Sequence, residues 1–289
     1  METALIELAC DDYDLSGTLS SGQAFRWKYI DGGWEGVIGG RWVRLTESPA
    51  VIRATTAGTP APDSVWLEHY LQVKVDLSVV IASFPPDDVM PEAVAACPGL
   101  RLLRQDKWEC LASFILSSTK QIVQIQEIVG LLCERFGPEI AGPANRPTQY
   151  AFPTAERLAA CSEAELRACK MGFRAPYLLE TARAVAGGFD LETLTRADVD
   201  EARDRLMEFP GVGRKIADCV LLFSCGFQTA FPVDVWIMKA LQKLYFPKRR
   251  ATLKRLHRFS QTHFGPNAGY AQQYLFHYVR IRSQHHAKD

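Results

Sequence analysis

Residues 206–219 read Leu-Met-Glu-Phe-Pro-Gly-Val-Gly-Arg-Lys-Ile-Ala-Asp-Cys, and this stretch decides how the second part of the chain folds. A helix is expected to end just before Pro210, because proline has no amide hydrogen to continue it. Gly211 and Gly213 permit a tight turn, and a second helix is expected to begin near Arg214. The free amides at the start of that helix form its positive end, which suits a phosphate group. The stretch therefore predicts two helices joined by a short hairpin.

Two charged residues follow this turn in the sequence, and their spacing is informative. Lys215 comes directly after it, and Asp234 comes about twenty residues later within Phe-Pro-Val-Asp-Val-Trp, residues 231–236. Many hairpins place a basic residue here only to touch phosphate, so Lys215 alone does not establish a reaction. An aspartate at the start of a helix is also an ordinary N-cap. The interpretation depends on both residues occurring together at this spacing.

The hairpin, Lys215 and Asp234 together resemble the helix-hairpin-helix/Gly-Pro-Asp superfamily of DNA repair glycosylases. The resemblance implies that Gly211, Val212 and Gly213 hold the DNA backbone without reading its sequence. It also implies that Lys215 attacks the sugar as the nucleophile and that Asp234 assists. Capping and catalysis are compatible roles for Asp234, because a carboxylate that accepts an amide hydrogen can also stabilise a cationic sugar.

This chemistry explains the residue types. A lysine amine at its reference pKa of about 10.4 is mostly protonated at neutral pH and is a poor nucleophile, so such a site must favour the neutral form. Attack on C1′ expels the base and leaves a Schiff base, from which β-elimination cuts the strand. The implied enzyme is a bifunctional DNA glycosylase and abasic-site lyase for which we expect no cofactor and no metal.

Further segments, spread over almost the whole chain, resemble 8-oxoguanine DNA glycosylases in particular. Residues 21–27, Ser-Gly-Gln-Ala-Phe-Arg-Trp, are similar to that family's Ser-Gly-Gln-x-Phe-Arg-Trp. The resemblance implies that the carbonyl of Gly22 accepts a hydrogen bond from the oxidised base. Oxidation turns the guanine N7 from an acceptor into a donor, and losing such a match costs ~1–3 kcal/mol. A plain turn at a strand end is the alternative reading of this segment.

Three more residues are implied to surround the flipped base. Cys219 lies four residues after Lys215, so both share one helix face, and the family's cysteine packs against the base. Residues 269–276, Gly-Tyr-Ala-Gln-Gln-Tyr-Leu-Phe, resemble the family's closing helix. There Gln272 aligns with the residue that reads the base edge and Phe276 with the one that stacks on it. Taken singly, Cys219 or Phe276 is equally typical of a buried core.

Base removal within a duplex requires the nucleotide to be flipped out and its space to be filled. Residues 170–175, Lys-Met-Gly-Phe-Arg-Ala, resemble the loop that does this, which makes Phe173 the wedge and Arg174 a reader of the partner base. Thr119 is assigned to the same opposite-base set, and it stands after Ser-Ser where eukaryotic members have asparagine. Gln124 stands where those members have a second arginine. These departures indicate a bacterial-type member.

The expected fold class is α+β, with an antiparallel sheet domain in residues 1–100 and a helix-hairpin-helix region in residues 101–289. The helical region is expected to form two subdomains with the active site between them. Strands are expected at Ala24–Ile30, Trp34–Ile38 and Arg41–Leu45, because Asp-Gly-Gly and Gly-Gly turns separate them. From Trp108 onward, apolar residues recur at helical spacing. Helices are expected at Ala155–Cys161, Glu163–Lys170, Ala175–Ala186, Val199–Glu208, Arg214–Phe223, Val235–Leu244, Ala251–Phe264 and Ala268–Arg282.

Charge is divided unevenly along the chain. The whole sequence has 33 basic and 33 acidic residues. Residues 1–100 hold 6 Lys/Arg against 14 Asp/Glu, a net of −8, so residues 101–289 hold 27 against 19, a net of +8. A polyanion is therefore expected to dock on the second part.

No apolar run reaches the roughly 20 residues of a membrane helix, and no secretory signal is evident. We expect an intracellular protein, in the cytoplasm or nucleoid if bacterial and in the nucleus if eukaryotic.

The eight cysteines are scattered without a C-x-x-C pair, so we expect reduced thiols and no iron–sulfur cluster. This absence counts against one alternative, an endonuclease III-like glycosylase for oxidised pyrimidines. A second alternative is a non-catalytic helix-hairpin-helix DNA-binding repair factor. The expected partner is double-stranded DNA containing 8-oxoguanine, with no membrane association, and the expected state is a monomer.

Overall fold

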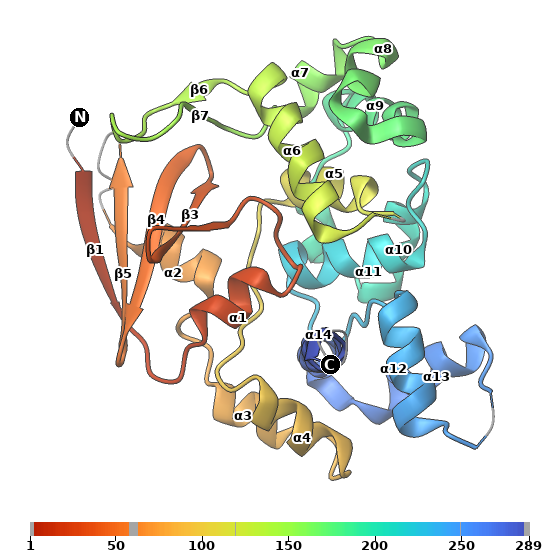
Figure 1. Ribbon diagram of the computed structural model, residues 1–289. Helices are drawn as coiled ribbons and strands as arrows, with labels where there is room; N and C mark the ends of the chain where they lie inside the picture. The colour runs from red at the N-terminus through yellow and green to blue at the C-terminus, as the bar shows by residue number, and fades with distance from the viewer. Residues whose placement is uncertain (1–2, 58–62, 119, 249, 286–289) are drawn as a thin grey trace.

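The computed structural model describes residues 3–57, 63–118, 120–248 and 250–285. Its amino-terminal part is built on a five-stranded antiparallel sheet in the order β1-β5-β4-β3-β2. Figure 1 shows this sheet on one side of the molecule and most helices on the other. The predicted α+β class is confirmed. The strands are β1 (Thr3–Ala9), β2 (Lys28–Ile30), β3 (Gly33–Ile38), β4 (Arg41–Ser48) and β5 (Val51–Ala57).

Two tight hairpins lie where the turn residues predict them. Asp31-Gly32 joins β2 to β3, and Gly39-Gly40 joins β3 to β4. All four turn residues have positive φ, between 48° and 77°. Two consecutive positive φ values match the right-handed twist of the flanking strands, which is why glycine and aspartate are favoured there. These turns fix the register of the sheet, with Ile30 opposite Gly33 and Ile38 opposite Arg41.

The first hundred residues also hold helices and two strands that the sequence pattern does not predict. The helices are α1 (Leu15–Ser20), α2 (Val65–Leu71), α3 (Leu77–Ala82) and α4 (Val89–Ala96), and the additional strands are β1 and β5. Local capping explains two of the helices, because Asp14 accepts a hydrogen bond from the amide of Gly17, and Asp76 from those of Ser78 and Val79. The predicted strand Ala24–Ile30 is shorter than expected, since only Lys28–Ile30 pairs with β3.

The remainder of the described chain is mainly helical, as predicted, and carries one small hairpin of β6 (Glu139–Ile140) and β7 (Gln149–Tyr150). Short helical turns are η1 (Arg167–Met171), η2 (Gly172–Arg174), η3 (Leu191–Arg196), η4 (Leu221–Cys225) and η5 (Gly265–Asn267). The longer helices are α5 (Lys107–Leu116), α6 (Ile122–Phe136), α7 (Ala155–Ala159), α8 (Glu163–Leu166), α9 (Ala175–Ala186), α10 (Val199–Met207), α11 (Arg214–Val220), α12 (Val235–Tyr245), α13 (Leu253–His263) and α14 (Ala268–His285). Within the described ranges, no helix is long and apolar enough to cross a bilayer.

Two hydrophobic cores hold these elements together. The smaller one joins the sheet to α1 and α2, through residues such as Leu45, Leu19 and Leu67. The larger one joins the helices, and it also takes in α3 and α4, whose Phe84-to-Met90 connection packs on α14. Figure 1 shows α3 and α4 beneath α14, away from the sheet. The larger core therefore draws on residues from both sides of the boundary predicted at residue 100.

Candidate active site

The predicted hairpin is present between α10 and α11. Gly211 has a φ of +77°, and a Cβ there would lie 2.5 Å from Cδ2 of Tyr177, so both the backbone and the space require glycine. Gly213 is the N-cap of α11, and a Cβ on it would meet nothing within 4 Å. Val212 is buried between them. The two exposed glycines thus leave the amides at the start of α11 open to an approaching phosphate.

A buried ion pair fixes the two helices of the hairpin. Nε of Arg203 on α10 donates to Oδ1 of Asp218 on α11 at 2.6 Å, and both side chains are almost fully buried. Nε of Arg214 lies 3.7 Å from the other oxygen of Asp218. Arg203 also contacts the exposed Asp200 one turn before it. This pairing sets how α11, which carries Lys215, is oriented on α10.

Lys215 is half-buried and is held by Phe114 of α5 and by Ser117, which caps the end of that helix. Its Nζ donates a hydrogen bond to Oγ of Ser117 at 3.3 Å and lies 5.2 Å from the centroid of the Phe114 ring. The Ser117 hydroxyl in turn donates to the carbonyl of Phe114 at 2.7 Å. Because its one hydrogen is used there, Ser117 is left to accept from the lysine. Neither neighbour was predicted as part of the site, since 98 residues separate Ser117 from Lys215.

Asp234 caps α12, as its position in the sequence predicts. Its Oδ1 accepts a hydrogen bond from the amide of Ile237 at 2.7 Å. Burial raises the pKa of the Asp234 carboxyl above its usual value, against the lowering effects of the Ile237 amide and of the nearby Lys215 ammonium. The carboxyl is therefore a partly desolvated group beside the lysine, where its charge acts with little screening by water.

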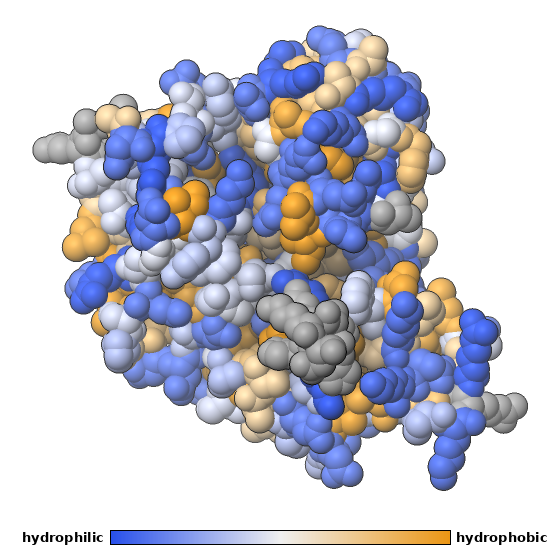
Figure 2. Space-filling view, in the orientation of Figure 1, coloured by the Kyte–Doolittle hydropathy of each residue, from blue (hydrophilic) through white to orange (hydrophobic). Residues whose placement is uncertain are grey.

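A cleft of about 800 Å³ brings the predicted residues together. Lys215, Asp234, Gly22 and Phe276 all line it, although they come from four separate segments of the chain. In the space-filling view the surface is hollowed between the sheet-bearing part and the helices opposite it (Figure 2). Trp236 also lines the cleft and is 44% exposed.

Two predicted base contacts lie behind this cleft rather than on its wall. Cys219 is buried, and burial raises the pKa of its thiol to about 12, so the thiol is neutral at physiological pH. Gln272 is 4% exposed, and its Oε1 has no hydrogen-bond partner among the described residues. A buried amide oxygen without a partner is unusual, so Gln272 has unused hydrogen-bonding capacity close to the site.

The predicted wedge loop has Phe173 outside and Arg174 inside. Phe173 is 55% exposed, whereas Arg174 is only 2% exposed and its Cζ lies 4.3 Å from the centroid of the Phe173 ring. Lys170 and Gly172 have φ of +62° and +61°, which turns the chain sharply before Phe173. Thr119 lies outside the described residues, while the neighbouring Lys120 lines the cleft.

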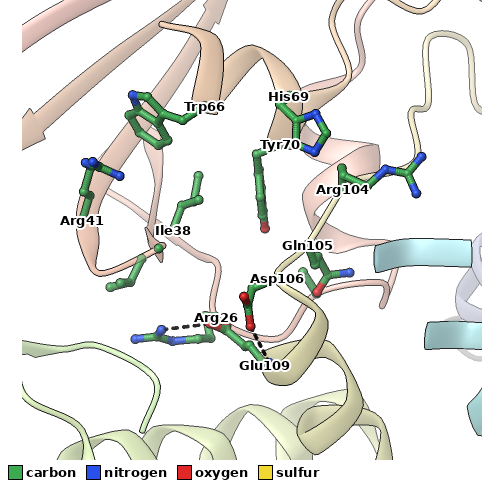
Figure 3. Close-up of a pocket in the computed structure, with 13 residues that line it drawn as sticks. Arg26, Ile38, Arg41, Trp66, His69, Tyr70, Arg104, Gln105, Asp106 and Glu109 are labelled. Carbon is green, nitrogen blue, oxygen red and sulfur yellow. Dashed lines mark hydrogen bonds and ion pairs between the residues drawn. The ribbon is translucent and has the colours of Figure 1, made fainter. Parts of the chain in front are cut away.

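A second, smaller cavity of about 280 Å³ lies on the other side of the segment that carries Gly22. Ala24 lines both cavities, so this segment forms part of the wall between them. Figure 3 shows Trp66, His69 and Tyr70 of α2 on one side of the smaller cavity, with Gln105 and the Arg26–Glu109 pair on the other. Nη1 of Arg26 lies 3.5 Å from Oε2 of Glu109. Burial raises the pKa of the Glu109 carboxyl.

Comparisons with known proteins identify the family of this chain. Residues 5–111 match the family described as 8-oxoguanine DNA glycosylase, N-terminal domain, and residues 112–265 match HhH-GPD superfamily base excision DNA repair protein. The N-glycosylase/DNA lyase OGG1 of Arabidopsis thaliana is 31% identical, over 94% of this chain and 78% of its own length.

Two solved structures resemble the whole chain. MBOgg1 in complex with a low affinity DNA ligand is 33% identical with a TM-score of 0.89, over 98% of this chain and 100% of that chain. The Clostridium acetobutylicum 8-oxoguanine glycosylase/lyase, solved with dsDNA containing cytosine opposite to 8-oxoG, is 30% identical with a TM-score of 0.87, over 97% and 98% of the two chains. The chain therefore belongs to the HhH-GPD superfamily of base excision DNA repair proteins and carries the amino-terminal domain of its 8-oxoguanine DNA glycosylases.

Proposed function

We propose that Lys215 is the nucleophile and Asp234 the essential carboxylate with which this protein, a bifunctional 8-oxoguanine N-glycosylase and DNA lyase, removes the damaged base from duplex DNA. The observation that supports these roles is the convergence of Lys215, Asp234, Gly22 and Phe276 on one cleft. Ser117 and Phe114 hold the amine within that cleft, and the cap of α12 holds the carboxylate.

The reaction uses these groups in order. The amine of Lys215 forms a bond to C1′ and gives up a proton as the glycosidic bond breaks, and the base leaves with the electron pair and takes up a proton. Asp234 stabilises the positive charge that develops on the sugar, and the poor screening of its own charge strengthens this effect. Opening of the sugar gives a Schiff base between Lys215 and C1′. Loss of a C2′ proton then expels the 3′ phosphate and cleaves the strand.

The remaining residues are assigned to recognition. Gly22, Cys219, Gln272 and Phe276 surround the flipped base, with Phe276 stacking on it. Phe173 fills the space that the base leaves, and Arg174 and Thr119 contact the partner base. The amides at Gly211, Val212 and Gly213 hold the DNA backbone. We assign a monomer that acts where the cell keeps its DNA, because one chain supplies every residue of this set.

Borohydride trapping tests the central assignment, since borohydride reduces a Schiff base to a stable amine and leaves enzyme attached to DNA. Wild type should be trapped on a duplex containing 8-oxoguanine, and Lys215→Gln should be neither trapped nor active while still binding the duplex. Lys120→Gln is a matched control, because Lys120 also lines the cleft but is not assigned to the chemistry. Trapping of Lys215→Gln at the wild-type level would reject Lys215 as the nucleophile.

A further inference from the structure

We propose that Gln105, Gln273 and Arg280 are specificity-positioning residues, which lock the backbone around Gly22 so that its carbonyl, and no amide hydrogen, faces the lesion. The inference rests on the proposed role of Gly22 as the sensor of 8-oxoguanine. It adds the residues that keep this sensor in the orientation in which it distinguishes the oxidised base from guanine.

The pattern of hydrogen bonds around Gly22 carries this inference. Nη2 of Arg280 donates to the carbonyl of Ser20 at 2.8 Å, and Nε2 of Gln273 donates to that of Ser21 at 3.1 Å. On the other side, Nε2 of Gln105 donates to the carbonyl of Gln23 at 2.6 Å.

The carbonyl of Gly22 lies between these three occupied carbonyls. It accepts no hydrogen bond from any residue in the part of the chain that the structure describes. Because Gly22 lines the cleft, its carbonyl is the acceptor of this segment that is left for a ligand.

The side chain of Gln23 anchors the same segment to the protein interior. It is fully buried, and its amide donates to the carbonyls of Thr18 at 3.0 Å and Arg101 at 2.8 Å. Its Oε1 accepts from the amide of Leu103 at 2.7 Å. Gln23 therefore fastens the loop to the strand-like connection that leads to α5, and Gln105 at the wall of the smaller cavity completes this attachment (Figure 3).

Glycine at this position makes such restraint necessary. Gly22 has a φ of +81°, and a Cβ there would lie 2.8 Å from Cδ1 of Ile122, so the position requires glycine. Glycine tolerates a wide range of backbone angles, and the peptide after it can rotate more easily than most. In a planar trans peptide the carbonyl and the amide hydrogen point in opposite directions, so a half-turn of the Gly22–Gln23 peptide exchanges one for the other.

The exchange would reverse the preference of the site. A carbonyl accepts a hydrogen bond from the N7–H of 8-oxoguanine and is repelled by the N7 lone pair of guanine. The amide hydrogen of Gln23 would instead bind guanine and be repelled by the lesion. The peptides on both sides of Gly22–Gln23 have their carbonyls held by Gln273 and Gln105, and these bonds restrict the adjustments of the flanking backbone that accompany such a rotation.

The experiment compares base excision with cleavage at a preformed abasic site, which has no base to recognise. In Arg280→Met and Gln273→Met, single-turnover excision of 8-oxoguanine should fall by about tenfold, the effect expected for losing one well-placed hydrogen bond. Abasic-site cleavage should change much less. The ratio of lesion-duplex affinity to undamaged-duplex affinity should fall as well, which a loss of overall structure would not produce selectively.

Two further variants make the result specific. Arg280→Lys keeps a donor for the Ser20 carbonyl and should recover most of the excision rate. Arg282→Met removes the same charge one half-turn along α14, where Arg282 contacts Tyr278 instead, and should match wild type. Arg280 is only half-buried, so its variants carry the test if Gln273→Met does not fold.

The inference is overturned if excision and abasic-site cleavage fall by equal factors, or if neither changes. A wild-type protein that neither excises 8-oxoguanine nor is trapped on DNA would instead refute the proposed function itself.

Discussion

The proposed function gives the Asp234 carboxylate a catalytic task beside its observed cap of α12, and substitution by asparagine separates the two. Asp234→Asn keeps an oxygen that can accept from the Ile237 amide, so the cap of α12 and the folded state should persist. It removes the negative charge, so we expect excision to slow by several orders of magnitude while lesion-DNA binding survives. Single-turnover rates together with thermal melting measure the two tasks separately. An equally active Asn variant would leave Asp234 with the capping role alone.

The pH profile gives a second measure of this carboxylate. Because burial raises the pKa of Asp234, the group takes up a proton at a higher pH than an exposed aspartate with a pKa of about 3.9. If the charged form is needed, excision should decline as the pH falls through this raised pKa, and the acid limb should lie at a higher pH than the pKa of an exposed aspartate. The small residual rate of Asp234→Asn should lack that limb. An acid limb that persists in the Asn variant would assign it to another group.

Opposite-base selectivity should be weaker here than in relatives with two arginines for the partner base. Gln124 occupies the place of the second one, and its Oε1 accepts from the Gln121 amide in the cap of α6. Each bidentate arginine contact supplies ~1–3 kcal/mol of discrimination, so Arg174 alone should leave selectivity lower by about one to two factors of ten. Excision opposite cytosine should still be preferred. Single-turnover rates for all four pairings, with Gln124→Arg beside wild type, test this. An equally steep cytosine preference would show that Thr119, Lys120 or Gln124 supplies the missing contact.

Candidate-site residues that stand in short sequence motifs could be predicted. Residues that reach the site only through contacts between distant segments could not. Lys215, Asp234 and the hairpin glycines stand in short motifs whose geometry is set by neighbouring residues. Ser117 and Phe114, which hold the amine, lie about a hundred residues away at the end of α5 and have no motif of their own. A serine at a helix end and a phenylalanine in a hydrophobic core are common in proteins, so neither residue indicates a functional site from the sequence alone.

At the scale of elements, the hairpin depends on its buried ion pair. Asp218→Ala would leave the Arg203 guanidinium buried with only the exposed Asp200 as a partner, and removing one member of a buried pair costs ~3–5 kcal/mol. We expect a clear fall in the urea midpoint with little change in slope. The double variant Arg203→Met with Asp218→Leu removes both charges and should be markedly more stable than Asp218→Ala. Equal stability of the two would mean that the charge imbalance is not the cause.

Helices could be predicted more closely than strands, for a physical reason. The predicted helix Ala175–Ala186 has the same bounds as α9, and Val235–Leu244 differs from α12 by one residue, because caps and helical periodicity are local. Strand β1 was missed since it is an edge strand that exposes Leu5, which disguises the alternation of buried and exposed side chains. Its existence depends on pairing with β5, and that partner lies almost fifty residues along the chain.

At the scale of the whole molecule, the sheet and the helices should unfold together. The attachments of Gln23 and the Arg26–Glu109 pair cross between the two parts, and they are buried or half-buried. Four of the six tryptophans lie in residues 1–100, whereas most helix lies beyond them. Tryptophan fluorescence therefore reports mainly on the sheet, and far-ultraviolet circular dichroism on the helices. We expect the two urea curves to coincide. Separate midpoints would show two independently folding units.

The contact between Arg174 and Phe173 has a consequence for the order in which the two residues would meet DNA. Arg174 is only 2% exposed and its guanidinium lies against the Phe173 ring, so in this arrangement it is not available to contact a base. In the proposed mechanism, Phe173 enters the stack, its ring leaves the guanidinium, and Arg174 then becomes available to the orphaned partner base. The identity of the partner base would then be checked only after the duplex has been opened. The enzyme would pass over undamaged DNA without this check, which would be confined to the few sites where a nucleotide has already left the helix.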